Sequence, residues 1–377
     1  MGDGRIHVCH VQTTLRAGGL ENGVVNVVNG LDPARFRSTV VCLHDAGALA
    51  ERITNPAAAV INLAYPDRLA PELPTKLAQL FKRLEPDIVH CRNYTPNLYG
   101  TLGARLARVP RVINGEHGMV QLVGWRKMLV SRALATLADR VLCVSPGLRD
   151  FLYERLRYPA GSVDVIINGV PLERFDHMEV DPAAKRRELG IPEDVWLLGT
   201  VARFFPFKDH PAMLDFLERV PEVDGRPVHA VIIGDGDQAT AFRAETERRG
   251  LSGRMHLPGF RADVHSCYAA FDLFCLLSTG NEGTSNAILE AMAAGTPVLS
   301  TLIPGNRHLI RSGENGVLVP PAGEPKLAAM QREIPRLLAD PAERRRLAEA
   351  AGREVRAKFR LQRMVDDYAA YYAALAD

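Results

Sequence analysis

The sequence lacks several features that mark specialised classes of protein. Aromatic residues make up only 6% of its 377 residues, with two tryptophans. No stretch approaches the roughly 18 apolar residues of a membrane-spanning helix. The 46 Lys and Arg nearly balance the 44 Asp and Glu, which leaves a net charge of +2. These absences argue against a membrane-spanning protein and against a nucleic-acid-binding protein, which would need a basic surface.

The sequence also lacks the cysteine and histidine patterns that typically bind metals. None of the six cysteines forms a C-x-x-C pair, and most lie in apolar runs: Cys9, Cys42, Cys91, Cys143, Cys267 and Cys275. We therefore expect reduced core cysteines. Asp235 and Asp237 have Asp-x-Asp spacing but fall in a glycine-rich turn, and no histidine pair has metal-ligand spacing. The sequence predicts no metal and, since the opening residues do not resemble a signal peptide, a cytoplasmic location.

The chain does contain two series of short apolar segments that alternate with helical patterns. The first series covers residues 6–11, 38–43, 59–63, 87–91, 111–114, 140–144 and 163–167, and the second covers 196–201, 229–233, 255–257, 273–277, 297–300 and 316–319. Such segments predict buried parallel strands, and 377 residues exceed one ordinary core. We expect two doubly wound α/β domains, 1–175 and 176–355, and an amphipathic C-terminal helix within 356–377 that packs on the N-terminal domain.

Residues 282–295 form the most informative motif. Gly283, Thr284 and Ser285 precede a run of strong helix formers, which Gly295 and Pro297 end. A helix that begins beside a glycine offers unpaired N–H groups and the positive end of its dipole, which suit a phosphate. Glu282 precedes this helix and Glu290 lies about two turns into it. Carboxylates beside an anion site suit the hydroxyl groups of an attached sugar.

Other candidate site residues follow predicted strands. Arg203 and Lys208 come after the strand at 196–201 and suit a diphosphate; the alternative is two solvated surface cations. Gly18 and Gly19 open a helix after the first strand, where a ligand or a plain tight turn is equally compatible.

His117 follows the strand at 111–114, at the end where catalytic groups gather; the alternative is a structural histidine. His90, Arg92 and Asn93 end another strand, with weaker claims. His210, beside the cationic loop, is interpreted as structural or helix-capping. The segment 232–236 lacks a complete G-x-G-x-x-G pattern and is interpreted as a turn.

Together these residues resemble the retaining glycosyltransferases of family 4, which have the GT-B fold of two Rossmann-like domains facing across a cleft. The most specific element is Glu282 and Glu290, separated by seven residues, within Glu-Gly-x5-Leu-Glu-Ala-Met-Ala-x-Gly-x-Pro-Val. The resemblance covers nearly the whole chain. It is strongest to bacterial sugar transferases of exopolysaccharide or exosortase-associated clusters.

The resemblance implies a role for each site residue. Glu290 would bind the donor ribose, Glu282 the transferred sugar, and the backbone of Gly283, Thr284 and Ser285 the phosphates. Arg203 and Lys208 would neutralise the diphosphate leaving group, with UDP or GDP expected as the nucleotide. Gly18 and Gly19 would approach the phosphates from the other domain, His117 would lie by the sugar and acceptor, and Asp235 and Arg261 could line the base pocket. No cofactor and no metal would be required.

The acceptor and the exact reaction stay open. The expected acceptor is a glycan, a lipid-linked sugar or a small molecule. Residues 125–132 could touch the inner membrane face or form an ordinary half-buried helix. His308 stands near a position where family members commonly carry Glu, which puts that donor contact in doubt. A GT-B epimerase, a phosphorylase and a catalytically silent sugar-nucleotide-binding protein are the alternative functions.

Overall fold

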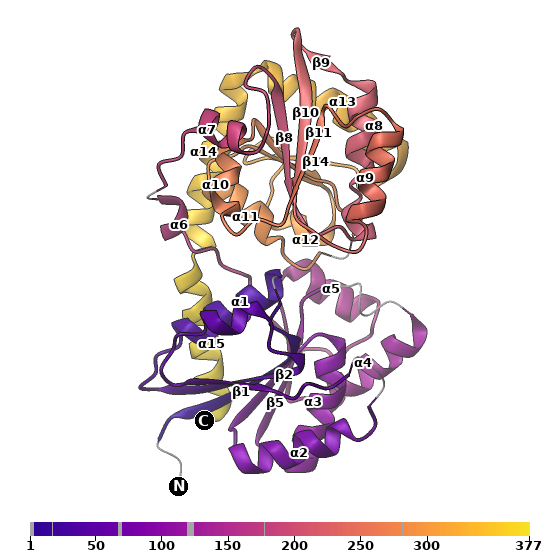
Figure 1. Ribbon diagram of the computed structural model, residues 1–377. Helices are drawn as coiled ribbons and strands as arrows, with labels where there is room; N and C mark the ends of the chain where they lie inside the picture. Colours follow the sequence, from indigo (N-terminus) through magenta and orange to yellow (C-terminus); the bar gives the residue numbers. More distant parts are fainter. Residues whose placement is uncertain (1–3, 17, 67–69, 119–123, 177, 281) are drawn as a thin grey trace. The chain divides into compact units, whose positions relative to one another are not determined.

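The computed structural model describes residues 4–16, 18–66, 70–118, 124–176, 178–280 and 282–377. The chain divides into two compact units (Figure 1). The first contains residues 1–169 and 361–377, and the second contains residues 170–360. The sequence predicted these boundaries at 175/176 and 355/356. In the structure, residues 170–175 and residues 356–360 belong to the second unit instead.

The first unit is built on a parallel sheet of seven strands in the order β3-β2-β1-β4-β5-β6-β7. The strands are β1 (Ile6–Thr14), β2 (Phe36–Asp45), β3 (Ala58–Asn62), β4 (Ile88–Arg92), β5 (Arg111–Glu116), β6 (Arg140–Cys143) and β7 (Val163–Val165). Its helices are α1 (Gly19–Gly30), η1 (Ala48–Arg52), α2 (Leu73–Leu84), α3 (Tyr94–Ala107), α4 (Trp125–Leu137), α5 (Pro146–Glu154) and α15 (Leu361–Ala376).

Alternate residues of the central strands bury their side chains on opposite faces of this sheet. On β1, Cys9 and Val11 pack in a cluster with Leu77 and Phe81 of α2. Val8 joins the opposite cluster, which contains residues of α1 and α15. Each fully buried Leu or Phe side chain contributes roughly 1.5–3 kcal/mol. Helices on both faces explain why the strands are nearly continuously apolar.

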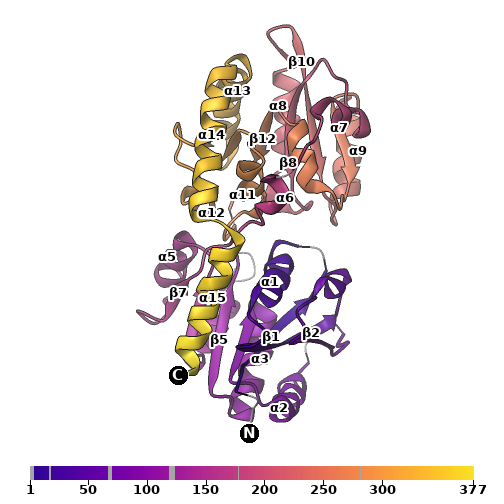
Figure 2. The same ribbon diagram turned by 90° about the vertical axis from the view of Figure 1, so that its left-hand side faces the viewer.

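The C-terminal helix α15 is part of the first unit although it follows the second in sequence. Figure 2 shows it beside β1 and β5. Met364, Tyr368 and Tyr372 point into the core, where Tyr372 is fully buried. The apolar face of the amphipathic helix α15 therefore packs in the core of the first unit.

The second unit has the strand order β11-β10-β8-β12-β13-β14, all parallel. The strands are β8 (Trp196–Val201), β10 (Arg226–Ile233), β11 (Met255–Gly259), β12 (Leu273–Leu276), β13 (Val298–Thr301) and β14 (Val317–Val319). The helices are α6 (Glu173–Asp176), α7 (Pro182–Glu188), η3 (Pro206–Lys208), α8 (Pro211–Arg219), α9 (Ala239–Arg248), α10 (Val264–Cys267), η4 (Tyr268–Ala270), α11 (Asn286–Ala293), α12 (Pro304–Arg307), α13 (Gly323–Ala339) and α14 (Pro341–Lys358).

One strand of the second unit was not predicted. β9 (Glu222–Val223) pairs antiparallel with the start of β10. Asp224 and Gly225 join them with φ of 50° and 75°. Two consecutive positive φ angles characterise a type I′ turn, for which Asp-Gly is a preferred pair. The sequence signal was therefore present, but the two-residue strand is too short for an apolar pattern.

The predicted arrangement of two parallel-sheet α/β units is confirmed. All six cysteines are free and buried, as expected. Within the described residues, no helix is both long enough and apolar enough to cross a bilayer.

Candidate functional site

In both units several of the candidate residues follow the strands at which the sheet order reverses, whereas His117 follows the next strand, β5. In the second unit the chain runs from β8 outward to β10 and β11, then returns to β12 on the other side of β8. Arg203 and Lys208 follow β8, and Glu282 follows β12. In the first unit Gly18 follows β1 and Arg92 ends β4, the strand on the other side of the reversal. Ligands of open α/β sheets bind at such switch points.

Lys208 and Glu282 meet directly at the switch point of the second unit. The Lys208 ammonium donates to Glu282 Oε1, and the two side chains are only 14% and 12% exposed. Ser278 Oγ donates to the same oxygen at 2.8 Å. No described residue donates a hydrogen bond to Glu282 Oε2. The carboxylate is thus fixed through one oxygen while the other can still accept.

Glu290 has a similar arrangement on α11. Tyr268 Oη donates to Glu290 Oε2 at 2.8 Å, and no described residue donates to Oε1. Burial raises the pKa of Glu290, while the Tyr268 hydrogen bond and the positive charge of Arg174 act in the opposite direction. A hydroxyl that donated to Oε1 would further favour the ionised form.

The start of α11 has the predicted geometry. Ser285 is the N-cap and its hydroxyl accepts from Ile288 N at 3.4 Å. Gly283, Thr284 and Ser285 are buried. Gly305 of α12 packs so tightly here that a Cβ would lie 2.3 Å from the carbonyl oxygen of Glu282. His308 follows α12, and its Nε2 lies 3.2 Å from the Thr284 hydroxyl. Gly305 and His308, in the segment that departs from the usual family pattern, therefore pack against the loop that contains Glu282 and Thr284.

Arg203 differs from Lys208 in being exposed. Its guanidinium lies 4.6 Å from the centre of the Phe205 ring. Among the described residues it has no carboxylate partner. A cation fixed on an aromatic ring at a strand end, without a counter-ion, can receive an anionic ligand.

Asp235 and Arg261, which the resemblance assigned to the base pocket, make local contacts, and His210 does as well. Asp235 Oδ1 accepts from the backbone N–H of Gly236 at 2.8 Å, which fits the predicted turn. Arg261 is held by Glu188 and by Asp263, with a 2.8 Å hydrogen bond to Asp263 Oδ1. His210 does not cap α8 with its side chain. His210 is nevertheless the N-cap residue of α8, and its Nε2 lies 3.2 Å from the Arg203 carbonyl oxygen, which agrees with a structural residue at the helix start.

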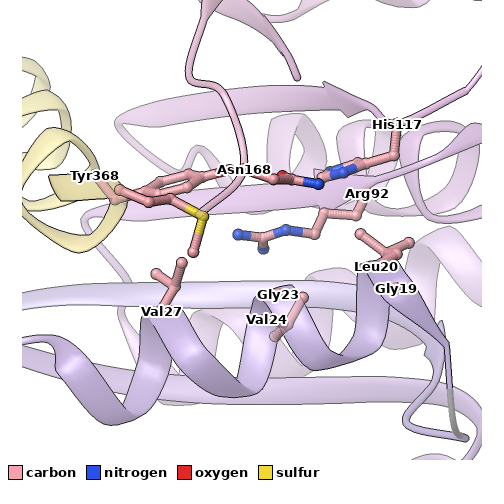
Figure 3. A pocket seen from close by; sticks show the side chains of 10 residues that line it. Gly19, Leu20, Gly23, Val24, Val27, Arg92, His117, Asn168 and Tyr368 are labelled. Carbon is pink, nitrogen blue, oxygen red and sulfur yellow. The ribbon is translucent and has the colours of Figure 1, made fainter. Parts of the chain in front are cut away.

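In the first unit His117 and Gly19 line one small cavity (Figure 3). Arg92, Asn168 and Tyr368 share this lining. The His117 backbone N–H donates to Asn93 Oδ1 at 3.3 Å. Burial, with a contribution from the Arg92 charge, lowers the pKa of His117 to about 3. His117 is therefore a neutral imidazole at physiological pH.

Gly18 caps α1 in an extended conformation that any residue can adopt. Its carbonyl accepts from both the backbone and the side chain of Asn22, at 3.0 and 2.9 Å. A Cβ at Gly18 would lie 2.1 Å from Glu21 Oε2. Because this atom is the end of a flexible side chain that can move, neither space nor backbone conformation strictly requires glycine at this position.

Several site residues were missed by sequence reasoning. Ser278 follows β12 directly, so the strand-end rule that selected Arg203 could have found it. Tyr268 carried no signal, because 22 residues separate it from Glu290. Lys326 is 3% exposed, and its ammonium binds Asp209 and the Leu277 carbonyl oxygen, which ties the Lys208 loop to the end of β12.

Comparison with known proteins identifies the family. A model described as glycosyltransferase family 4 matches residues 17–174, and one described as glycosyl transferases group 1 matches residues 181–354. A D-inositol 3-phosphate glycosyltransferase of Geodermatophilus obscurus is 32% identical over 77% of this chain and 67% of its own length. The chain is a family 4 glycosyltransferase of the GT-B type.

Further relatives agree with this assignment. A UDP-Gal:alpha-D-GlcNAc-diphosphoundecaprenol alpha-1,3-galactosyltransferase of Escherichia coli is 27% identical over 84% of both chains. The solved structure of Anabaena HepE with UDP and glucose has a TM-score of 0.85 at 22% identity, covering 98% of this chain and 100% of HepE. The glycosyltransferase therefore acts on a nucleotide-sugar donor.

Glu116, which precedes His117, provides a test of the electrostatics of the first unit. It is 2% exposed and accepts hydrogen bonds from Asn97 Nδ2 and Tyr158 Oη, both at 3.1 Å. Burial raises the pKa of this carboxyl to about 8, although both hydrogen bonds lower it. The folded glycosyltransferase therefore keeps a proton at pH 7 that the unfolded chain releases.

We predict that the contribution of Glu116 to stability falls as pH rises from about 4.5 to about 8, because this carboxyl binds fewer protons in the unfolded state over that range. Glu116 can contribute at most about 1.4 kcal/mol per pH unit. Glu116→Gln keeps an acceptor oxygen but does not titrate, so its unfolding free energy in urea should depend less on pH. Glu247→Gln, at an exposed position, is the control. Equal pH slopes for Glu116→Gln and the wild type would show that Glu116 is already ionised in the folded state.

Proposed function

We propose that this glycosyltransferase retains anomeric configuration and transfers a sugar from a UDP- or GDP-linked donor to a sugar-containing or lipid-linked acceptor, without a required metal. The observation that carries the proposal is the pair of glutamates at the switch point of the second unit. Each uses one oxygen for an internal hydrogen bond and has no described donor at the other. Two fixed acceptors suit a ligand that carries two sets of hydroxyls, such as a sugar linked to a nucleotide.

Charge placement supports the same assignment. Glycosyl transfer generates a nucleoside diphosphate, so the leaving group gains negative charge as the bond breaks. Arg203 and Lys208 both follow β8 and would stabilise that charge, together with the N-terminus of α11. Lys208 would share its charge between Glu282 and the phosphate, and the positive field of these groups would act in place of a metal ion.

In the proposed front-face mechanism the acceptor hydroxyl attacks from the side on which the diphosphate leaves. Its proton passes to the departing phosphate oxygen, so no protein base is needed. The neutral His117 would position a hydroxyl of the sugar or acceptor. Glu282 would hold the hydroxyls of the transferred sugar while positive charge develops at its anomeric carbon.

The reaction can be tested by finding the donor and then following product stereochemistry. A thermal-shift screen of UDP, GDP and ADP sugars should reveal the donor, because a ligand at 100 times its Kd stabilises the fold by about 2.7 kcal/mol. Nucleotide release should then require an acceptor and persist in EDTA. The anomeric proton signal of the product should show the donor configuration. An inverted linkage would contradict retention, and a new sugar nucleotide made without acceptor would indicate an epimerase.

Substitutions of the two glutamates should affect different kinetic parameters. Glu282→Ala should lower kcat about 10²–10³-fold, as expected when a fixed group that acts on developing charge is lost. Glu290→Gln keeps an acceptor for Tyr268 but loses the charge, so donor binding should weaken about tenfold or more with a smaller change in kcat. Wild-type donor affinity should also fall as acid protonates Glu290, and Glu290→Gln should remove that dependence.

Initial-rate kinetics and calorimetric donor titration would measure these effects, with the exposed Glu247→Ala as the control. Unchanged transfer by Glu282→Ala would refute its assignment to the sugar.

A lipid-linked acceptor would be reached most easily from a membrane surface, and α4 has a composition that fits. Trp125 and Leu129 are 67% and 58% exposed. The helix carries Arg126, Lys127 and Arg132 but no acidic residue. A basic helix with exposed apolar side chains can bind an anionic bilayer. The E. coli relative, whose acceptor by name is a diphosphoundecaprenol derivative, adds support.

We expect the protein to co-sediment with vesicles that contain phosphatidylglycerol, and less with phosphatidylcholine alone. The double substitution Trp125→Ala, Leu129→Ala should weaken that binding about tenfold, since it removes the inserting side chains. Phe260→Ala removes an equally exposed apolar side chain, 64% exposed, from the second unit and serves as the control. Equal binding by all three proteins would exclude α4 as the contact.

A further inference from the structure

Arg92 is the largest of the fully buried side chains, and its charge has no counter-ion among the described residues. It ends β4 and is 2% exposed. Burying a guanidinium is costly unless its donors are satisfied and its charge is compensated. A buried arginine without a carboxylate therefore requires an explanation.

Aromatic and imidazole groups surround the guanidinium instead of acids. Arg92 Nη1 donates to His10 Nδ1 at 2.9 Å, so His10 must be unprotonated at that nitrogen. The guanidinium carbon lies 5.9 Å from the centre of the Tyr368 ring on α15. Tyr372, one helical turn further along α15, bonds His90 Nδ1 at 2.8 Å. Polarisable neutral groups stabilise the cation without cancelling its charge.

The same side chain reaches the candidate site. Arg92 and Tyr368 line the cavity that His117, Asn168 and the first turns of α1 also line, and Figure 3 shows these four polar side chains around it. The cavity measures only about 10 Å³, roughly the space of one water molecule. It is too small for a phosphate, so Arg92 does not serve as an anion-binding residue in this conformation.

We propose that Arg92 is a positioning residue for His117 and that α15 is part of the transfer site, because its two tyrosines hold the guanidinium beside the cavity that His117 lines. The proposal rests on the role of His117 given above. Burial is the main reason that the His117 imidazole stays neutral, and the uncompensated Arg92 cation adds to it by disfavouring a second positive charge nearby. A neutral imidazole can both donate and accept a hydrogen bond.

The titratable groups near His117 are consistent with this. Arg92 and His90 come from β4, Glu116 from its own strand, Tyr368 from α15, and Glu21 lies in the first turn of α1. Arg92 contributes to lowering the pKa of His117 and of His10 and His90 as well. Glu116 is held in its neutral form by burial. Among these groups, Arg92 supplies the charge that contributes to the lowered pKa of His117, after the larger effect of burial.

The test compares Arg92→Met, which removes the charge, with Arg92→Lys, which keeps it. Imidazole NMR of the full-length protein, assigned with a His117→Gln spectrum, would follow His117 across pH without any ligand. Arg92→Met should raise the pKa of His117 by about one unit, the shift expected from removing a like charge nearby. It should also move the acid limb of UDP-glucose turnover to higher pH. Arg92→Lys should restore both.

Arg37→Met is the matched control. Arg37 Nη2 lies 2.8 Å from His7 Nδ1, which makes a similar Arg–His contact in the same sheet outside the cavity lining. Arg37→Met should change the titration of His7 and leave the pH profile of turnover unchanged. Tyr372→Phe removes a single hydroxyl and tests the contribution of α15 even if Arg92→Met does not fold. It should lower kcat several-fold with the KM for UDP-glucose unchanged.

An unchanged His117 titration in Arg92→Met would overturn the proposal, as would an unchanged kcat in Tyr372→Phe for the part that concerns α15. If the His117 titration moves but the pH profile does not, the link between Arg92 and His117 stands. In that case the role of His117 in transfer is wrong.

Discussion

The arrangement of the candidate site in the second unit depends on the ion pair between Lys208 and Glu282. Both side chains are nearly buried, so each charge would be costly without the other. The pair joins the loop after β8 to the loop after β12, and Lys326 strengthens the same connection through Asp209 and the Leu277 carbonyl. Losing either member of the pair would leave a buried charge and release a loop. The pair thus orders the site before any donor arrives, which is the condition for effective electrostatic catalysis.

Sheet topology explains why these loops are neighbours. β8 and β12 are adjacent in the sheet although β9, β10 and β11 lie between them in sequence. In the first unit, β1 and β4 are adjacent across a similar reversal. The crossover helices diverge on either side of such a point and leave the strand ends open. Gly18, Gly19 and Arg92 in one unit, and Arg203, Lys208 and Glu282 in the other, are therefore placed by the same topological rule.

Much of this could be predicted from the sequence because the decisive signals are local. The capping serine and terminal glycine of α11, the buried strands and the strand-end cations all depend on neighbouring residues. The contacts that tune the site are not local. The Tyr268–Glu290 hydrogen bond and the enclosure of Arg92 by Tyr368 and Tyr372 depend on which strands and helices pack together. The tyrosines of α15 were correctly interpreted as core residues, but their contact with a charged group had no sequence signal.

The two units solve the problem of burying polar groups in opposite ways. In the second unit, Lys208 and Glu282 are both charged and neutralise one another. In the first, the groups around the cavity are neutral except for Arg92: burial lowers the pKa of His117 to about 3 and raises that of Glu116 to about 8. Both groups are therefore mostly neutral between about pH 4 and pH 7, so burial in the first unit is achieved with uncharged forms, whereas in the second unit it is achieved with a pair of opposite charges.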